Sequence, residues 1–179
     1  MATEPDQGEN LCLQCGLCCD GTLFRDVEIQ PGDDAAKLRA LGLPLRNDAV
    51  ARFPQPCAAL CPELKCRVYA DRPARCQQFE CTLFKAVAAK KMEFPAALKT
   101  IRQTRQQAVK VRQLLREMGD MGESIALAKR FKRVKRKFDA GEIPAGLDTE
   151  TAYDGFAELS LAVHELDLRL RAKFYPDPM

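Results

Sequence analysis

Hydrophobic residues in the second half of the chain recur at steps of three and four, which is the spacing of one face of an α-helix. The pattern covers residues 94–118, 123–139 and 149–174. Gly119 follows the first segment and Gly141 the second, and glycine commonly ends a helix. These segments predict three helices that pack as an antiparallel hairpin or bundle.

The last of these segments has the most regular hydrophobic stripe. Its positions alternate steps of three and four, which indicates a seam that needs a partner helix. The stripe consists of Phe156, Leu159, Val163, Leu166 and Leu170. We therefore expect a mainly α fold in which the C-terminal helices are packed against the rest of the chain.

The first half has no comparable periodicity. Residues 22–30 alternate loosely and predict one short strand, residues 35–42 predict a short helix, and the proline-rich residues 42–63 should be irregular. We expect three parts: a disordered leader at 1–11, a small irregular module at 12–81 and a helical region at 82–179.

Charge and cysteine content distinguish the two halves further. Residues 1–81 carry a net charge of −3 and residues 82–179 a net charge of +6, and all nine cysteines lie between Cys12 and Cys81. The first ten residues lack the features of a secretory signal, and no apolar run is long enough to span a bilayer. We therefore expect a cytoplasmic protein, in which clustered cysteines are metal ligands or redox thiols rather than disulfides.

The spacing of the first cysteines favours metal binding. Cys12, Cys15 and Cys18 are each separated by two residues, a spacing that closes a tight turn around one zinc or iron ion. Ferredoxin-type iron–sulfur ligation uses a similar spacing, although this chain lacks the proline that follows the last cysteine there. Side chains of neighbours diverge, so we expect Cys18 and Cys19 to serve different sites, or one of them to bridge two ions or to lie in a second shell. Two four-thiolate sites would use eight cysteines, and a polynuclear cluster is the other arrangement.

Other interpretations of the cysteines fit less well. A thioredoxin-like redox pair at Cys12 and Cys15 should lie between a strand and a helix, and the sequence predicts neither there. Inert buried cysteines rarely occur in a cluster of nine. Structural zinc contributes about 10–16 kcal/mol, comparable to the roughly 5–15 kcal/mol net stability of a whole domain. We therefore expect bound metal to stabilise the fold of residues 12–81. An iron–sulfur protein in electron transfer or redox catalysis is the alternative, and no motif identifies an enzyme.

Five cysteine-containing segments together resemble the YkgJ-type cysteine-cluster family, which is described as a zinc- or iron-chelating domain. They are Cys12-x-x-Cys15-Gly16-x-Cys18-Cys19, Cys57-Ala58-Ala59-Leu60, Cys66-Arg67-Val68-Tyr69, Arg72-Pro73-Ala74-Arg75-Cys76 and Phe79-Glu80-Cys81. The resemblance covers about residues 12–81 and implies eight metal ligands: Cys12, Cys15, Cys18, Cys19, Cys57, Cys66, Cys76 and Cys81. Cys61 is then an additional thiol, and Gln77 stands where the family usually has arginine.

Residues around the proposed ligands suggest supporting roles. Pro73 suits the start of a helix that leads to Cys76. Tyr69 and Phe79 are candidates for a dry shell around the thiolates, or are ordinary core aromatics. Three arginines are available to offset thiolate charge or are simply solvated: Arg67, Arg72 and Arg75.

The predicted helix at 123–139 contains a basic segment, residues 129–137, with seven bases in nine positions. It is a candidate surface for an anionic partner, which would make the chain a nucleic-acid-binding protein with a structural metal. Solvation, or docking on the acidic cysteine half, is the interpretation we favour. His164 is the one histidine of the chain, and we expect it at the surface rather than on a metal.

Overall fold

The fold is known from a computed structural model, which describes residues 7–46 and 49–175. Over half of the chain (53%) is helical and 5% is strand, so the prediction of a mainly helical fold is confirmed. In chain order the elements are α1 (Gln7–Leu13), β1 (Asp26–Glu28), α2 (Ala35–Ala40), β2 (Arg52–Pro54), η1 (Tyr69–Asp71), α3 (Ala74–Gln78), α4 (Thr82–Ala88), α5 (Phe94–Glu117), α6 (Leu127–Asp139) and α7 (Thr149–Lys173).

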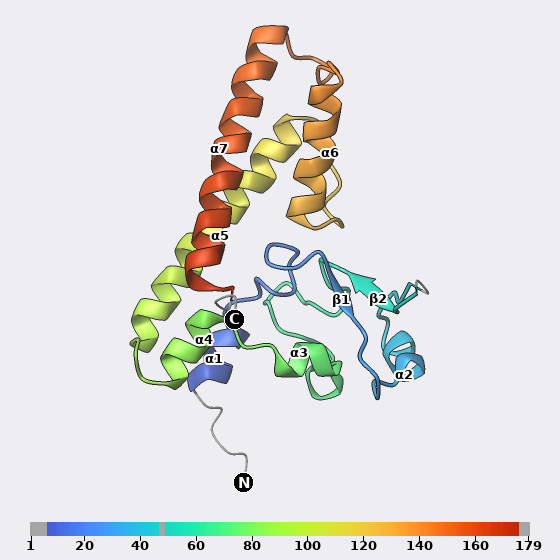
Figure 1. Cartoon of the computed structure of the whole chain (residues 1–179), viewed down its shortest axis with the longest axis vertical. Coiled ribbons are helices and arrows are strands. Elements are labelled where there is room, and N and C mark those ends of the chain that lie inside the picture. Colours follow the sequence, from blue (N-terminus) through green and yellow to red (C-terminus); the bar gives the residue numbers. More distant parts are fainter. Residues whose placement is uncertain (1–6, 47–48, 176–179) are drawn as a thin grey trace.

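The three long helices form the upper part of the molecule in Figure 1, where α7 runs antiparallel to α5. Their bounds agree with the predicted segments to within a few residues, and α5 and α7 pack closely along their lengths. α5 ends next to Gly119, whose φ of +78° is a conformation that favours glycine. Asp148 begins α7, because its carboxylate accepts a hydrogen bond from the Thr151 amide at 2.8 Å.

The N-terminal leader is only partly as predicted. Residues 1–6 lie outside the described residues, and residues 7–11 belong to α1 rather than to a disordered leader. The helix forms because Leu11 is buried (2% exposed) and because α1 packs against α4 and α5. Cys12 lies in this helix, whereas the sequence had suggested irregular backbone from there on.

The strand content is small and differs from the prediction in one place. The strand expected over residues 22–30 shortens to β1, which pairs antiparallel with β2 and places Val27 opposite Phe53. β2 was wrongly predicted as irregular because of its prolines. Pro54 is tolerated because it ends a short strand, and the buried Phe53 holds the strand in place.

Two hydrophobic clusters stabilise the described residues. The larger core contains side chains of α1, α4, α5, α6 and α7 together with Leu17 and Leu23. The smaller core contains five buried residues around the strands: Val27, Leu38, Leu43, Phe53 and Ala59. The larger core includes residues from both sides of Cys81, and a domain boundary at that residue stays a prediction. No described helix combines the length and the hydrophobicity that a bilayer-spanning segment needs.

Candidate metal centre

The first cysteine segment is a series of tight turns that follows α1. The Cys15 amide donates to the carbonyl oxygen of Cys12 at 3.1 Å, and the Cys19 amide donates to that of Gly16 at 2.9 Å. Gly16 has a φ of +69°, and a Cβ added there would lie 3.0 Å from the side chain of Leu64. Glycine is therefore needed both for the turn and for the close approach of the second cysteine segment.

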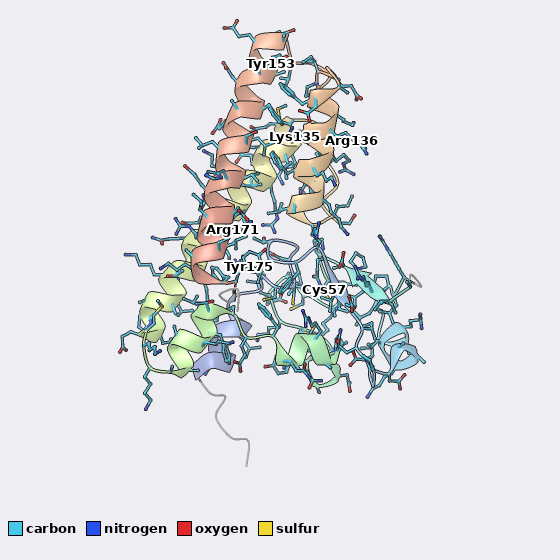
Figure 2. All side chains as sticks on the ribbon, viewed as in Figure 1. Cys57, Lys135, Arg136, Tyr153, Arg171 and Tyr175 are labelled. Carbon is cyan, nitrogen blue, oxygen red and sulfur yellow. The ribbon has the colours of Figure 1, made fainter. Side chains whose placement is uncertain are left out.

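The second segment is held against the first by the backbone. The Cys57 amide donates to the carbonyl oxygen of Cys19 at 2.7 Å, which brings two cysteines that are far apart in sequence side by side. The chain then folds back on itself, so that Cys66 lies opposite Leu60 in an antiparallel bridge. Figure 2 shows Cys57 below α6 and to the right of the lower end of α7.

Cys76 and Cys81 lie on two short helices that continue from this loop. α3 begins after Pro73, as predicted, and its first amide, that of Ala74, donates to a carboxylate oxygen of Asp33 at 2.8 Å. Asp33 therefore fixes the helix that carries Cys76, a role that its sequence context did not reveal. Cys81 is the N-cap of α4, where its Sγ accepts a hydrogen bond from the Phe84 amide at 3.4 Å.

Four thiols form what we call the first cysteine group: Cys12, Cys15, Cys18 and Cys81. The pKa of Cys15 is raised to about 12, first by burial and then by the neighbouring thiols of Cys81 and Cys12. Burial also raises the pKa of Cys18, and its next strongest influences are Cys15, Cys19, Cys81 and Cys12. Burial likewise raises the pKa of Cys81. Because each neighbouring thiolate would repel the next, these sulfurs form one electrostatic cluster.

The second cysteine group contains Cys19, Cys57, Cys66 and Cys76. Burial raises the pKa of Cys19 most, followed by Cys57, Cys76 and Cys66. The pKa of Cys76 is raised to about 12 by burial and then by Cys57 and Cys66, although the Arg72 guanidinium opposes this shift. The pKa of Cys57 is raised by burial and by Cys66. Cys18 and Cys19 thus belong to different groups that adjoin each other.

Hydrophobic packing divides the same cysteines in the same way. Three members of the first group, Cys15, Cys18 and Cys81, pack against the larger core. Three members of the second group pack against the smaller core: Cys57, Cys66 and Cys76. Each group is therefore attached to its own hydrophobic cluster.

Cys61 has different neighbours from both groups. Its Sγ accepts a hydrogen bond from the Lys65 amide at 3.3 Å, and it lowers the pKa of Glu63 by hydrogen bonding to that carboxylate. Cys61 therefore belongs to the turn between Leu60 and Cys66. Its hydrogen bonds with Lys65 and Glu63 lie within that turn, whereas the grouped thiols influence one another.

The donor chemistry suits a soft metal ion, although the side chains are not arranged as a closed site. All nine cysteines are free thiols, and the two groups contain sulfur donors alone. As the side chains stand, no three Cys, His, Asp or Glu groups in the described residues could hold one ion. Ligation would require the thiols of a group to lose protons and to turn toward a common centre.

The aromatic and basic residues near the thiols have mixed roles. Phe79 packs edge-to-face on Phe24 at 4.8 Å and covers the larger core near the first group. Tyr69 instead lies under the Arg72 guanidinium, 3.6 Å from its ring centre. The Arg67 guanidinium donates to the carbonyl oxygen of Ala58, and its charge partly opposes the rise in the pKa of Cys57 that burial causes. Arg67 and Arg72 therefore act against the raised pKa values of nearby thiols. Arg67 and Arg75 are both exposed, and Arg72 is partly buried.

Four of the seven bases in segment 129–137 pair with three carboxylates of the described residues. Arg130 is buried (1% exposed) and its Nε lies 2.9 Å from an oxygen of Asp120, which also pairs with Arg133. Lys129 pairs with Asp26 of β1 at 3.3 Å, and Lys135 pairs with Asp139 at 2.7 Å. The sequence had placed all these bases on the surface. The pair with Asp26 joins the start of the segment to the cysteine half, and an anionic partner for the rest of its basic face stays a prediction.

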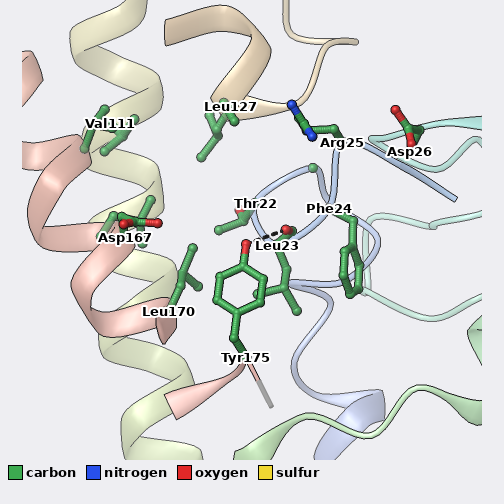
Figure 3. Close-up of a pocket in the computed structure, with 14 residues that line it drawn as sticks. Thr22, Leu23, Phe24, Arg25, Asp26, Val111, Leu127, Asp167, Leu170 and Tyr175 are labelled. Carbon is green, nitrogen blue, oxygen red and sulfur yellow. Dashed lines mark hydrogen bonds between the residues drawn. The ribbon is translucent and has the colours of Figure 1, made fainter. Parts of the chain in front are cut away.

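A cleft lies between the loop of residues 21–26 and the long helices (Figure 3). It has a volume of about 470 Å³ and is lined by Leu127, Leu166 and Leu170 on the helices and by residues 21–26 on the loop. The Tyr175 hydroxyl closes one end by donating to the carbonyl oxygen of Leu23 at 2.9 Å. No cysteine lines it, so the cleft is separate from the thiol groups.

These features define a helical protein with a cysteine cluster that has the donor set of a metal chelator. A family model matches residues 11–111, with the description "CxxCxxCC: Putative zinc- or iron-chelating domain". The match covers more than half of the chain, so the chain belongs to this family, as the resemblance indicated. It extends beyond Cys81 through α4 and into α5. No curated protein and no solved structure matches the chain.

Proposed function

We propose that this protein binds zinc or iron through two sites of four cysteine thiolates each. The first cysteine group would form one site and the second group the other. The observation that carries the proposal is the division of eight thiols into two groups of four, to which electrostatic proximity and hydrophobic packing both point. Membership in a chelating family supports the same chemistry.

The chain's contribution to such sites is to hold thiols close together, most of them partly buried. Thiolates bind zinc and iron strongly, and an ion would supply the positive charge that allows them to deprotonate. Burial keeps the pKa of Cys15 and Cys76 near 12, so the thiols are protonated at neutral pH without an ion. Metal binding would therefore release protons and should tighten as the pH rises.

We further propose that the bound metal is held for structural or metal-handling purposes rather than for catalysis. The smaller core contains five buried residues, too few to stabilise its surroundings alone. A reducing compartment such as the cytoplasm suits the protein, because oxidation to disulfides would remove its donors.

Elemental analysis of single-cysteine variants tests the proposal. The protein should be isolated without oxygen or chelators from cells replete in zinc and iron. Cys15→Ser should lower the metal content of the first site and Cys66→Ser that of the second, so that each loses about half of the wild-type metal. Cys61→Ser is the matched control and should retain it. Equal losses in all three variants would contradict the assignment.

The absorbance spectrum distinguishes the forms that the metal takes. Zinc on thiolates is colourless at visible wavelengths, whereas an iron–sulfur cluster absorbs strongly there. If each of the variants Cys15→Ser and Cys66→Ser lost all of the visible absorbance, a single polynuclear cluster would replace the two-site assignment.

A further inference from the structure

The face of α6 that points away from the larger core carries a line of positive charge. Leu127 and Val134 mark the inner face, since both are buried. Lys129, Lys132 and Arg136 are exposed, and their spacing of three and four residues places them on one line opposite that inner face. The outermost positions of α6 are therefore basic along more than two turns.

The start of this line meets two arginines of the strand region. Lys129 Nζ lies 3.3 Å from one Asp26 oxygen, and Arg52 lies 3.9 Å from the other. Arg46 lies opposite Arg52 in an antiparallel bridge, with backbone hydrogen bonds of 2.7 and 3.3 Å. Figure 1 shows β1 and β2 below the start of α6. Three segments that are distant in sequence thus bring three cations to one place.

These cations line a small depression in the surface. Its volume is about 120 Å³, and its lining consists of Asp26, Arg46, Arg52, Phe53, Pro54 and Lys129. Three cations and one carboxylate give the lining an excess of positive charge. A water molecule takes up roughly 30 Å³ of the liquid, so the depression has room for an anion of the size of phosphate.

The pairing of Arg46 with Arg52 has a cost for the folded chain alone. Like charges directly opposite each other in an antiparallel pair are destabilising. Glu28 offsets part of this cost, because its carboxylate lies 2.9 Å from Arg52. A bound phosphate would offset more, since guanidinium groups match the geometry of phosphate oxygens and bind them with paired hydrogen bonds.

The carboxylates beside the line and the depression do not cancel its charge. There are three of them, and each already pairs with a base: Asp26 with Lys129 and Arg52, Glu28 with Arg52, and Asp139 with Lys135. The cations number six: Arg46, Arg52, Lys129, Lys132, Lys135 and Arg136. The surface therefore keeps an excess of three positive charges at neutral pH.

We propose that this basic surface, formed by Arg46, Arg52, Lys129, Lys132 and Arg136, binds the phosphate backbone of a nucleic acid. One phosphate occupies the depression, and the next ones lie against Lys132 and Arg136. At a rise of roughly 1.5 Å per residue, the line from Lys129 to Arg136 spans about 10 Å. One nucleic-acid strand carries about three phosphates over that length. The contacts are to the backbone, so binding is independent of base sequence.

The composition of the surface distinguishes a nucleic acid from other anionic partners. The centres of protein–protein interfaces are depleted of charged residues, whereas this line is basic throughout. A helix that lies on a membrane inserts an apolar face into the lipid. The apolar face of α6 is already buried in the larger core through Leu127 and Val134. A repeating chain of phosphates is the partner that matches a line of cations.

Fluorescence anisotropy of a labelled single-stranded oligonucleotide of mixed sequence tests the proposal on the metal-replete full chain. The affinity of the wild type should fall as the salt concentration rises. The double variant Lys132→Gln with Arg136→Gln should bind about tenfold more weakly, and its logarithmic salt dependence should be shallower by about 0.7 for each lost contact. The matched control is Lys99→Gln with Arg102→Gln, which removes two exposed bases near the start of α5 and should bind as the wild type does.

Arg46→Gln tests the depression separately. It should weaken binding of the oligonucleotide, and circular dichroism reports whether each variant keeps its helices. Absence of wild-type binding at low salt, equal weakening in the two double variants, or unchanged affinity in Arg46→Gln would overturn the proposal. Poly-glutamate or phosphatidylserine vesicles that displace the oligonucleotide at equal charge concentration would assign the surface to an acidic protein or a membrane instead.

Discussion

Asp120 binds two arginines and is the strongest example of a residue that the sequence pattern did not identify. It is 4% exposed, and its carboxylate accepts hydrogen bonds from Arg130 at 2.9 Å, Arg133 at 2.7 Å and the Gly122 amide at 3.0 Å. Burial acts to raise its pKa, but the hydrogen bonds from Arg133 and Arg130 outweigh it and the pKa is lowered. The loop between α5 and α6 depends on this carboxylate.

Removal of the Asp120 carboxylate should strongly destabilise the chain. Asp120→Ala leaves the buried Arg130 guanidinium without its counter-charge, and loss of one partner of a buried pair costs about 3–5 kcal/mol. Urea unfolding followed by circular dichroism measures the free energy of unfolding. Asp139→Ala removes an exposed carboxylate, so its effect should be within about 1 kcal/mol. Equal effects of the two changes would contradict the role of Asp120.

The lowered pKa of Asp120 also gives a dependence on acid. A carboxylate with a lower pKa in the folded state stabilises that state above its ordinary pKa of 3.8, and this stabilisation is lost as the pH falls through the lowered value. The free energy of unfolding of the wild type should therefore decline below pH 3.8. Asp120→Asn should show a shallower decline over that range, measured by urea unfolding at a series of pH values. An identical decline in both proteins would show that Asp120 is not responsible.

The cysteines show how much of the candidate site can be predicted from residue patterns. Adjacency predicted that Cys18 and Cys19 serve different sites, or that one of them bridges or lies in a second shell, and this stays a prediction. Cys19 is among the strongest influences that raise the pKa of Cys18, whereas the pKa of Cys19 is raised by burial and then by Cys57, Cys76 and Cys66. The grouping of the other cysteines was not predictable, because it depends on contacts between distant segments such as the Cys57–Cys19 backbone hydrogen bond. Arg130 was wrongly predicted to be at the surface for a similar reason. A buried arginine requires an acidic partner, and hydrophobic periodicity does not reveal that partner.

At the level of elements, the long periodic helices were predicted well, and so was the short helix α2, which was expected over residues 35–42. Other short elements were missed. The stripe of α7 identified its inner face because burial repeats at every turn. β2 and α4 are three and seven residues long, and neither is long enough to show a period. Their formation depends on tertiary contacts, such as the hydrogen bond from the Thr82 hydroxyl to the Tyr175 carbonyl oxygen at 2.6 Å.

The interface between α5 and α7 should dominate the stability of the helical half. Leu159 is fully buried there, so Leu159→Ala should lower the free energy of unfolding by about 2–5 kcal/mol. Val109→Ala changes an exposed residue of α5 and should alter it by less than about 0.5 kcal/mol. Thermal unfolding followed by circular dichroism compares the two. A small effect of Leu159→Ala would mean that the helices are not packed as described.

At the level of the whole molecule, the cysteine segments and the long helices are connected by several polar contacts. Arg112 of α5 binds the Asp20 carboxylate at 2.9 Å and the Thr22 hydroxyl at 3.0 Å. The Leu127 amide at the start of α6 donates to the Gly21 carbonyl oxygen at 2.9 Å. These contacts join the two regions. The helical region is stabilised mainly by the larger core and the strand region by the smaller one.

Metal removal should affect these regions unequally. If metal holds the second cysteine group, an anaerobic chelator should increase hydrogen exchange first around β1, β2 and α3, which surround the smaller core. The amides of α5 and α7 should stay protected longer, because their hydrophobic contacts do not involve the thiols. Hydrogen exchange with mass spectrometry measures both regions in one sample. Uniform loss of protection would show that the whole chain unfolds with its metal.

The most direct test of the account is the native mass of the oxygen-free, chelator-free protein. The account predicts a folded chain whose mass includes two zinc or iron ions, and the same chain without them after denaturation in acid. A fully folded chain with the mass of the polypeptide alone would contradict it.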